Sequence, residues 1–349
     1  MVQYRVLVVD DSSFMRGALT RMIEMDKRFK VIDTAENGEV AVKKILELRP
    51  DVVTMDIEMP VMNGIEALKK VIASGSKTPI VMVSTLTEAG AQVTMEALEI
   101  GAVDFIPKAL NDKDKNIFRG SDVIAEKLVA AVGAGSGQAA QQIQAEAAPK
   151  TALPQPKTSV TSRSDIKLIV IGSSTGGPKA LQVVLSKLPA NLRVPVVVAQ
   201  HMPANFTKAL AKRLDETVPL KVVEASNGDV MVPGTVYIAP GGQHLRMTAN
   251  GIRVADDKGE SPYKPSVDVL AGSIHGVLKS HVLAVMLTGM GNDGTRAFVQ
   301  LHTDGAHVIA QDQASSVVYG MPKAVLEAGG VDEVLPVEKI GARVAQIVS

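Results

Sequence analysis

Short apolar runs alternate along the chain with longer segments in which apolar residues recur every three or four positions. In the first third, the apolar runs predict strands at 5–9, 30–35, 52–55, 80–83 and 104–106. The periodic segments between them predict helices, for example over 12–25 and 39–48. Strands that alternate with helices indicate a parallel sheet covered by helices on both faces, so this part is expected to be an α/β domain.

The same alternation returns in the second half, where strands are expected at 167–171, 195–199 and 282–287. Between the halves, Gly, Ala, Gln, Pro, Ser and Thr dominate and apolar periodicity is lost, as in a flexible linker. We therefore expect a first domain over 1–130, a linker over 131–165, and a second, doubly wound and mainly parallel α/β domain over 166–349.

Composition narrows the possible classes of protein. The chain has 349 residues and a formal net charge of zero, without a basic domain, so nucleic acid is not an expected partner. It contains no cysteine, which excludes disulfides, thiolate metal sites and a cysteine nucleophile. The N-terminus does not resemble a signal peptide, and no apolar run reaches the roughly 18 residues that span a bilayer. A cytoplasmic protein without membrane insertion is expected.

Polar side chains stand at four strand ends of the first domain. Asp10 and Asp11 follow the first strand and Asp56 the third, at one edge of the expected sheet. Clustered carboxylates repel one another and favour a bound cation. Hard oxygen ligands suit Mg²⁺, which also takes phosphate oxygens. Ser84 and Lys108, at the ends of the fourth and fifth strands, are placed to contact a phosphoryl group on Asp56.

Residues 1–125 resemble a response-regulator receiver domain in the stretches V-L-V-V-D-D, V-T-M-D-I-E-M-P-V-M-N-G and D-F-I-P-K. The resemblance implies a flavodoxin-like (βα)5 fold with Mg²⁺ held by Asp10, Asp11 and Asp56. It also implies that a histidine kinase is the phosphodonor and that Asp56 is the phosphoacceptor.

The same resemblance implies that Ser84 and Phe105 form a switch pair that responds to the phosphoryl group, together with Lys108. Receivers usually have proline after this lysine, joined by a cis bond, whereas this chain has Ala109. A cis bond before a residue other than proline costs about 2.5–4 kcal/mol, so a trans bond is expected here.

The most informative stretch of the second half is G-S-S-T-G-G-P at 172–178, which follows an apolar strand and opens a helix. It places hydroxyls at a helix N-terminus, where free N–H groups and the helix dipole favour negative charge. This layout suits either a serine nucleophile beside an oxyanion site or a phosphate cradle. A Walker-type loop requires Lys and then Ser or Thr after its last glycine, whereas Pro178 follows Gly177. The dinucleotide pattern fails too, because Ser174 stands where its second glycine belongs.

A histidine and an aspartate follow two other strands of this half. His201 stands just past the strand at 195–199, and Asp293 lies in the glycine-rich run after the strand at 282–287. If these strands are parallel, both side chains emerge at the edge that carries the serine loop. His201 can then take the serine proton, and Asp293 can orient the imidazole. A structural histidine and simple turn chemistry at Asp293 are the alternatives.

Residues 167–335 resemble the catalytic domain of the bacterial chemotaxis protein-glutamate methylesterases. The shared stretches are I-G-S-S-T-G-G-P, A-Q-H-M-P, V-Y-I-A-P-G, K-P-S-V-D-V-L, M-L-T-G-M-G-N-D-G and Y-G-M-P. The resemblance implies a triad of Ser174, His201 and Asp293, with backbone groups of Met290 and Thr175 at the oxyanion. The residues alone do not separate Ser173 from Ser174 as the nucleophile, whereas the resemblance favours Ser174.

The resulting expectation is a phosphorylation-regulated esterase that demethylates chemoreceptors and deamidates glutamines there. It would use Mg²⁺ for phosphorylation of the receiver and no cofactor for the esterase step. Two rivals are an output domain that only binds a partner or nucleotide, and an inactive esterase-like scaffold that competes for receptors. A DNA-binding regulator is disfavoured, because the second half has no basic recognition helix.

Overall fold

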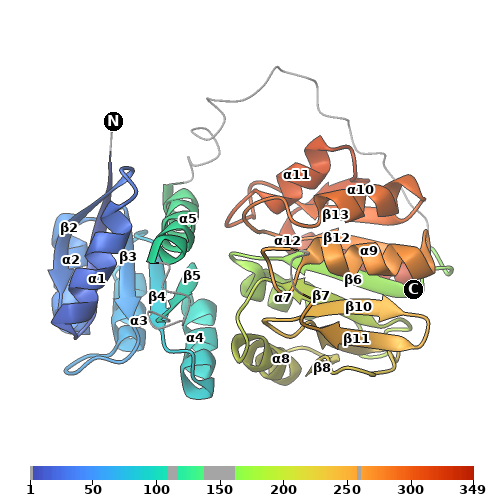
Figure 1. Cartoon of the computed structure of the whole chain (residues 1–349), viewed down its shortest axis with the longest axis horizontal. Helices are drawn as coiled ribbons and strands as arrows, with labels where there is room; N and C mark the ends of the chain where they lie inside the picture. The colour runs from blue at the N-terminus through green and yellow to red at the C-terminus, as the bar shows by residue number, and fades with distance from the viewer. Residues whose placement is uncertain (1–2, 109–116, 137–161, 258–260) are drawn as a thin grey trace. The chain divides into compact units, whose positions relative to one another are not determined.

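The computed structural model describes residues 3–108, 117–136, 162–257 and 261–349. They belong to two compact units, Met1–Ala145 and Glu146–Ser349, each built around its own sheet (Figure 1). Among the helices that the described residues form, none is long and apolar enough to cross a membrane.

The first unit is a five-stranded parallel sheet in the order β2-β1-β3-β4-β5, which confirms the expected (βα)5 receiver fold. Its elements are β1 Tyr4–Val9, α1 Ser13–Glu24, β2 Phe29–Ala35, α2 Gly38–Leu48, β3 Val52–Asp56, α3 Gly64–Ala73, β4 Ile80–Ser84, α4 Glu88–Ile100, β5 Asp104–Pro107 and α5 Ile117–Ser136. Side-chain caps begin helices α1 to α4, as where Asn63 and Glu66 form a capping box at α3.

The core of this unit joins the sheet to α1 and α5. Leu19 and Ile23 of α1 and Leu128 of α5 pack with buried valines of the central strands. Helix α5 continues to Ser136, past the boundary expected at 130, because Ala131 and Val132 extend its buried face. The predicted linker therefore overlaps α5 at its start, and its central part, 137–161, lies outside the described residues.

The second unit has a seven-stranded parallel sheet in the order β14-β13-β12-β6-β7-β9-β8 and an antiparallel pair, β10-β11. Its elements are β6 Leu168–Ser173, α7 Gly177–Leu185, β7 Val196–Gln200, α8 Phe206–Thr217, β8 Lys221–Glu224, β9 Thr235–Ile238, β10 His244–Thr248, β11 Gly251–Ala255, α9 Val267–Leu278, β12 Val282–Met286, α10 Thr295–Thr303, β13 His307–Gln311, α11 Met321–Glu327, β14 Glu333–Leu335 and α12 Val337–Val348. This architecture confirms the predicted mainly parallel α/β fold.

Helices cover both faces of the larger sheet. Helices α9, α10 and α11 pack against one face through a buried cluster that includes Leu270, Phe298 and Val325. Helices α7 and α12 contact each other in the opposite layer. In the centre, Gly172 of β6 pairs with Ala199 of β7 and with Met286 of β12. These three strands therefore end side by side, and the loops that follow them share one edge.

The first described residues of this unit are fastened to its C-terminal region. The Ser162 hydroxyl donates to the backbone carbonyl of Ser349 over 2.5 Å, and the N–H of Arg163 donates to the carbonyl of Ile347 over 2.7 Å. The Arg163 guanidinium also bonds the carbonyls of Gly305 and Ser280. The chain thus enters β6 from a point at the amino ends of the strands.

A partly buried ion pair joins α12 to the edge strand β14. Arg343 donates to both carboxylate oxygens of Glu333, and His307 Nε2 lies 2.8 Å from Glu333 Oε1. The two charged side chains are only 15% and 14% exposed. Burial opposes the charge of Glu333, but the hydrogen bonds from Arg343 and His307 outweigh it and hold the pKa of the carboxyl below its usual value.

We expect Glu333→Gln to destabilise the second unit by about 1.5–3 kcal/mol at neutral pH, the range for a hydrogen bond to a charged group. Because the folded-state pKa lies below the unfolded value of about 4.3, the ion pair contributes fully above that pH. The contribution is lost as the pH falls through the folded-state pKa. Urea denaturation should therefore show a difference in the free energy of unfolding between wild type and variant that becomes smaller as the pH is lowered.

Glu327→Gln is the matched control, because it removes an exposed i,i+4 partner of Lys323 on α11. It should change stability by less than about 0.5 kcal/mol. Equal losses in the two variants, or a gap that widens in acid, would contradict this account of the Glu333 ion pair.

Candidate active site and phosphorylation site

The serine loop of the second unit is a tight turn between β6 and α7. The N–H of Gly177 donates to the carbonyl of Ser174 over 2.8 Å, and Gly176 caps α7 with a φ of 76°. A Cβ on Gly177 would lie 1.9 Å from Gln200 Oε1. A side chain at 177 would displace the Gln200 amide from its bonds to Ser173 and Ser174, so glycine lets the serine loop lie against the end of β7.

The two neighbouring serines have different surroundings. Ser173 is fully buried, and its hydroxyl donates to Gln200 Oε1 over 2.7 Å. The amide of Gln200 in turn donates to the carbonyl of Ser174 over 2.9 Å. Ser174 is partly exposed at the edge of the sheet. The geometry therefore favours Ser174 over Ser173 as the hydroxyl that a substrate can reach.

His201 and Asp293 meet at the same edge. His201 Nε2 lies 2.8 Å from Asp293 Oδ2, and the two side chains are 11% and 5% exposed. The backbone N–H of His201 donates to the carbonyl of Ser173, which ties the start of this loop to the serine turn. No hydrogen bond joins the Ser174 hydroxyl to His201 in the described part of the chain. Catalytic hydrogen bonds often tighten only when substrate is bound.

The carboxylate of Asp293 sits at the N-terminus of α9. It accepts hydrogen bonds from the Ser266 hydroxyl and from the N–H groups of Val267 and Asp268, at 2.8, 2.6 and 3.2 Å. Burial raises the pKa of Asp293, but the hydrogen bonds from His201, Val267 and Ser266 outweigh it and lower the pKa overall. The group is therefore an ionised acceptor that can orient the imidazole and stabilise an imidazolium.

The loop after β12 packs directly on the serine turn. A Cβ on Gly289 would lie 2.9 Å from the Cβ of Ser174. Thr288 joins this loop to the serine loop and to the segment before α11. Its hydroxyl donates to the carbonyl of buried Thr175 and accepts from the N–H of Val318. Within the described residues the backbone N–H of Met290 has no hydrogen-bond partner. This N–H can therefore donate a hydrogen bond to a bound group.

Three residues that support this edge escaped the sequence analysis. They are Gln200, Ser266 and Tyr263, whose ring stacks on that of His201 with centroids 4.5 Å apart and an interplanar angle of 2°. Gln200 and Ser266 belong to stretches already noted for their resemblance, A-Q-H-M-P and K-P-S-V-D-V-L. Spacing alone carries no signal for any of them, because each acts through a side-chain contact between distant loops.

The first unit brings its predicted acidic residues together. Carboxylate oxygens of Asp10, Asp11 and Asp56 all lie within 4.8 Å of one another. Asp10 and Asp56 are buried, whereas Asp11 is exposed. The Lys108 ammonium is 2.7 Å from Asp56 Oδ2 and 3.1 Å from Asp10 Oδ2. Three close carboxylates are the hard oxygen donors that Mg²⁺ prefers, so the donor set fits this ion.

Charge and burial oppose each other in this cluster. Burial, helped by the charge of Asp10, raises the pKa of Asp56 despite the hydrogen bond from Lys108. Burial lowers the pKa of Lys108, but the contacts with Asp56 and Asp10 outweigh it and raise the pKa overall. A divalent cation would relieve the repulsion among the carboxylates and favour the ionised form of Asp56.

The predicted switch residues lie on the neighbouring strands. Ser84, at the end of β4, is buried; its hydroxyl donates to the carbonyl of Gly90 and accepts from Thr94 in α4. Phe105 on β5 is also buried, with the Lys127 ammonium 5.2 Å from its ring centroid. The expected trans bond before Ala109 lies outside the described residues.

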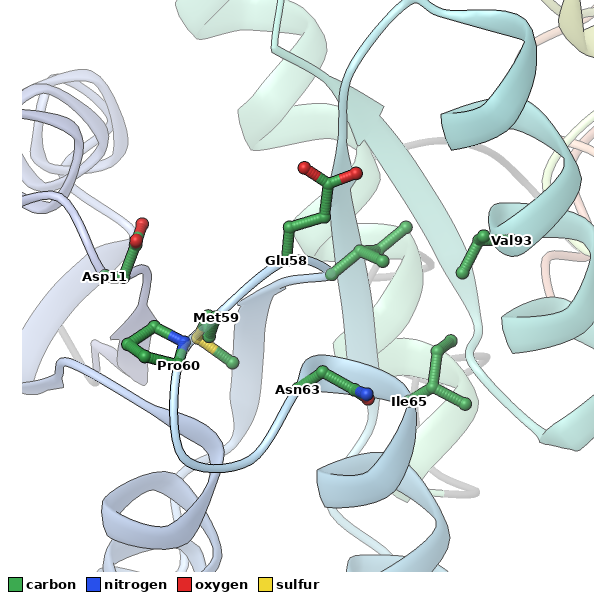
Figure 2. A pocket seen from close by; sticks show the side chains of 8 residues that line it. Asp11, Glu58, Met59, Pro60, Asn63, Ile65 and Val93 are labelled. Carbon is green, nitrogen blue, oxygen red and sulfur yellow. The ribbon is translucent and has the colours of Figure 1, made fainter.

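A groove runs beside the acidic cluster, between the loop after β3 and helix α4. Figure 2 shows Asp11 at one end and Ile65 and Val93 at the other, with Glu58 and Met59 between them. Most of its lining residues follow the end of β3, where Asp56 stands, so a ligand on Asp56 would lie next to this groove.

The comparisons with known proteins agree with this division. Residues 169–344 match the family described as CheB methylesterase, and residues 6–116 match the response regulator receiver domain. A Thermotoga maritima protein named protein-glutamate methylesterase/protein-glutamine glutaminase is 44% identical over 352 residues, covering 99% of this chain and 98% of its own. A protein of the same name from Halalkalibacterium halodurans is 43% identical over 340 residues, covering 96% of each chain.

A solved structure supports the fold of the second unit. The crystal structure of the Thermotoga maritima CheB methylesterase catalytic domain is 44% identical, with a TM-score of 0.51, and covers 52% of this chain and 99% of that chain. The protein is thus a response regulator in which a receiver precedes an enzymatic domain. It belongs to the CheB methylesterase family.

Removal of one carboxylate from the acidic cluster should weaken binding of Mg²⁺. We expect Asp11→Asn to lower the affinity of the full chain for Mg²⁺ about tenfold or more, equivalent to about 1.4 kcal/mol. Isothermal titration calorimetry with MgCl₂ would measure it. Asp11 is exposed, so the change should leave the fold intact.

Glu47→Gln provides the control, because it removes an exposed carboxylate on α2 that is outside the acidic cluster. Its Mg²⁺ affinity should match that of wild type. An unchanged affinity in Asp11→Asn would remove Asp11 from the set of metal ligands.

Proposed function

We propose that the chain is a phosphorylation-regulated hydrolase of the bacterial cytoplasm that acts on chemoreceptors. It hydrolyses glutamyl methyl esters to glutamate and methanol, and it deamidates glutamine at such sites. The contact between His201 and buried Asp293, at the sheet edge that carries Ser174, is the observation that supports this proposal most directly. The names of the relatives from Thermotoga maritima and Halalkalibacterium halodurans support the choice of substrate.

In the proposed mechanism the Ser174 hydroxyl attacks the ester carbonyl and transfers its proton to His201. Because Nε2 contacts Asp293, the accepting nitrogen is Nδ1. The N–H groups of Met290 and Thr175 bind the oxyanion, where one donor typically contributes about 2.7–4 kcal/mol. His201 returns the proton to the departing methoxide, and water then hydrolyses the glutamyl-serine ester. With a glutamine substrate the leaving group is ammonia, and the esterase step requires no cofactor.

The receiver is proposed to control this reaction. A chemotaxis histidine kinase donates a phosphoryl group to Asp56, with Mg²⁺ held by Asp10, Asp11 and Asp56 to balance the charge of phosphate and carboxylates. Lys108 contacts the phosphoryl group, and Ser84 and Phe105 respond to it. In this division of labour the receiver extends to the end of α5 at Ser136, the linker follows it, and the esterase extends from Ser162 to Ser349. The unphosphorylated receiver restricts access to Ser174.

The nucleophile can be tested with two neighbouring variants. We expect Ser174→Ala to reduce methanol release from radiomethylated receptor membranes at least about 1,000-fold, because loss of a nucleophile disables the whole triad. Ser173→Ala removes the adjacent buried hydroxyl and leaves the Gln200 carbonyl without that donor. It should lower stability by about 1–3 kcal/mol but retain the reaction.

The two variants separate the possible outcomes. If Ser173→Ala abolishes release and Ser174→Ala does not, the assignment of the nucleophile is wrong. If wild type releases no methanol with or without acetyl phosphate and Mg²⁺, the proposed substrate is wrong.

Control by the receiver predicts that the second unit alone is active. A fragment of residues 150–349 should release methanol faster than the unphosphorylated full chain, and acetyl phosphate with Mg²⁺ should activate the full chain only. A hundredfold activation corresponds to about 2.7 kcal/mol of differential stability between restricted and open states. Asp56→Asn is the control that should remain at the unphosphorylated rate. A fragment no faster than the unphosphorylated chain would contradict restriction of access.

A further inference from the structure

We propose that Tyr263 is a positioning residue that holds the imidazole of His201 in its working plane. This inference rests on the proposed function, in which His201 moves protons to and from Ser174. The rings of Tyr263 and His201 are stacked, with centroids 4.5 Å apart and planes that differ by 2°.

The stack supplies a constraint that the contact with Asp293 lacks. The single contact between Nε2 and Asp293 fixes one edge of the imidazole but still permits the ring to tilt about that contact. A parallel ring against its face opposes such tilting. Proton transfer depends on the direction of Nδ1, so a small tilt would misplace the nitrogen that takes the serine proton in the proposed mechanism. The aromatic face also attracts the positive charge that the imidazole gains with the proton.

The segment that carries Tyr263 is itself anchored to the site. Two residues on from Lys264, the Ser266 hydroxyl donates to Asp293 Oδ1. The backbone carbonyl of Lys264 accepts from the N–H of Gly242, and its ammonium pairs with Asp256. Residues 263–266 therefore support both His201 and Asp293. Tyr263 lies against the face of the imidazole, and Ser266 binds the carboxylate.

The position of Tyr263 also raises the alternative of contact with substrate. The side chain is 37% exposed, and its hydroxyl would lie 3.4 Å from a Cβ placed on Gly291, next to Met290 in the loop after β12. A residue that holds His201 should act through its ring and alter kcat. A residue that binds substrate should act on KM, or through its hydroxyl.

Two variants distinguish these roles. We expect Tyr263→Phe, which keeps the ring, to retain methanol release within about twofold of wild type. Tyr263→Leu, which removes the ring but stays apolar, should lower kcat about fivefold to tenfold with KM unchanged, in line with the strength of a stacked pair. Kinetics of the full chain, phosphorylated with acetyl phosphate and Mg²⁺ and acting on radiomethylated receptor membranes, would measure both constants.

A surface variant and the unfolding curves complete the test. Val230→Ala changes a side chain that is 70% exposed and should leave kcat and KM unchanged. Thermal unfolding should show the same midpoint for the second unit in both Tyr263 variants. The proposal would be overturned if Tyr263→Leu alone had a lower midpoint and its loss of kcat disappeared when the assay was run at lower temperature. That result would assign the ring a structural role.

Three kinetic results would also overturn it. They are an unchanged kcat in Tyr263→Leu, an equal loss in Tyr263→Phe, or a rise in KM without a change in kcat. Each of these is measured against an active wild type. Failure of wild type to release methanol would instead count against the proposed function itself.

Discussion

The buried carboxylate of Asp293 is the constraint on which the sheet edge that carries Ser174 and His201 depends. A carboxylate removed from water is stable only where hydrogen bonds replace its hydration, and removal of a partner leaves a costly buried charge. Here the replacements come from the start of α9 and from His201. The need to satisfy one charge therefore fixes the loop after β12, the segment before α9 and the loop after β7 relative to one another.

The acidic cluster of the receiver illustrates the opposite situation. Asp293 is surrounded by donors and has a lowered pKa, whereas Asp56 is buried beside a second carboxylate and has a raised one. The hydrogen-bond donors around Asp293 balance its charge, so this carboxylate can hold the neighbouring groups in fixed positions. The acidic cluster has excess negative charge, with the Lys108 ammonium paired to two of its three carboxylates. A site with such an imbalance is sensitive to added ions and covalent groups, as a switch requires.

Much of this arrangement could be predicted from the sequence because parallel sheets impose it. Alternation of strands and helices places Ser174, His201 and Asp293 at strand ends, and parallel pairing brings those ends to one edge. The extent of α5 could not be predicted from composition. Ala131 and Val132 lie where small residues begin to dominate, yet they are buried against the sheet, because packing outweighs weak local patterning.

The supporting contacts could not be predicted for a different reason. The hydrogen bond of Ser173 to Gln200 and the stacking of Tyr263 on His201 depend on side-chain orientation across loops that are remote in sequence. No periodic pattern encodes such orientation. The sequence thus predicted which residues reach the edge, while the structure was needed to find which residues hold them there.

The hydrogen bonds of Ser162 and Arg163 to the C-terminal region fix the point at which the chain enters the second unit. Ser162 and Arg163 lie at the amino ends of the strands, whereas Ser174 lies beyond their carboxyl ends. Strand β6 has six residues, which at about 3.3 Å each separate these edges by about 20 Å. The full height of the sheet therefore separates the attachment of Ser162 and Arg163 from the edge that carries Ser174, so a change at this attachment can leave the side chains of that edge in place.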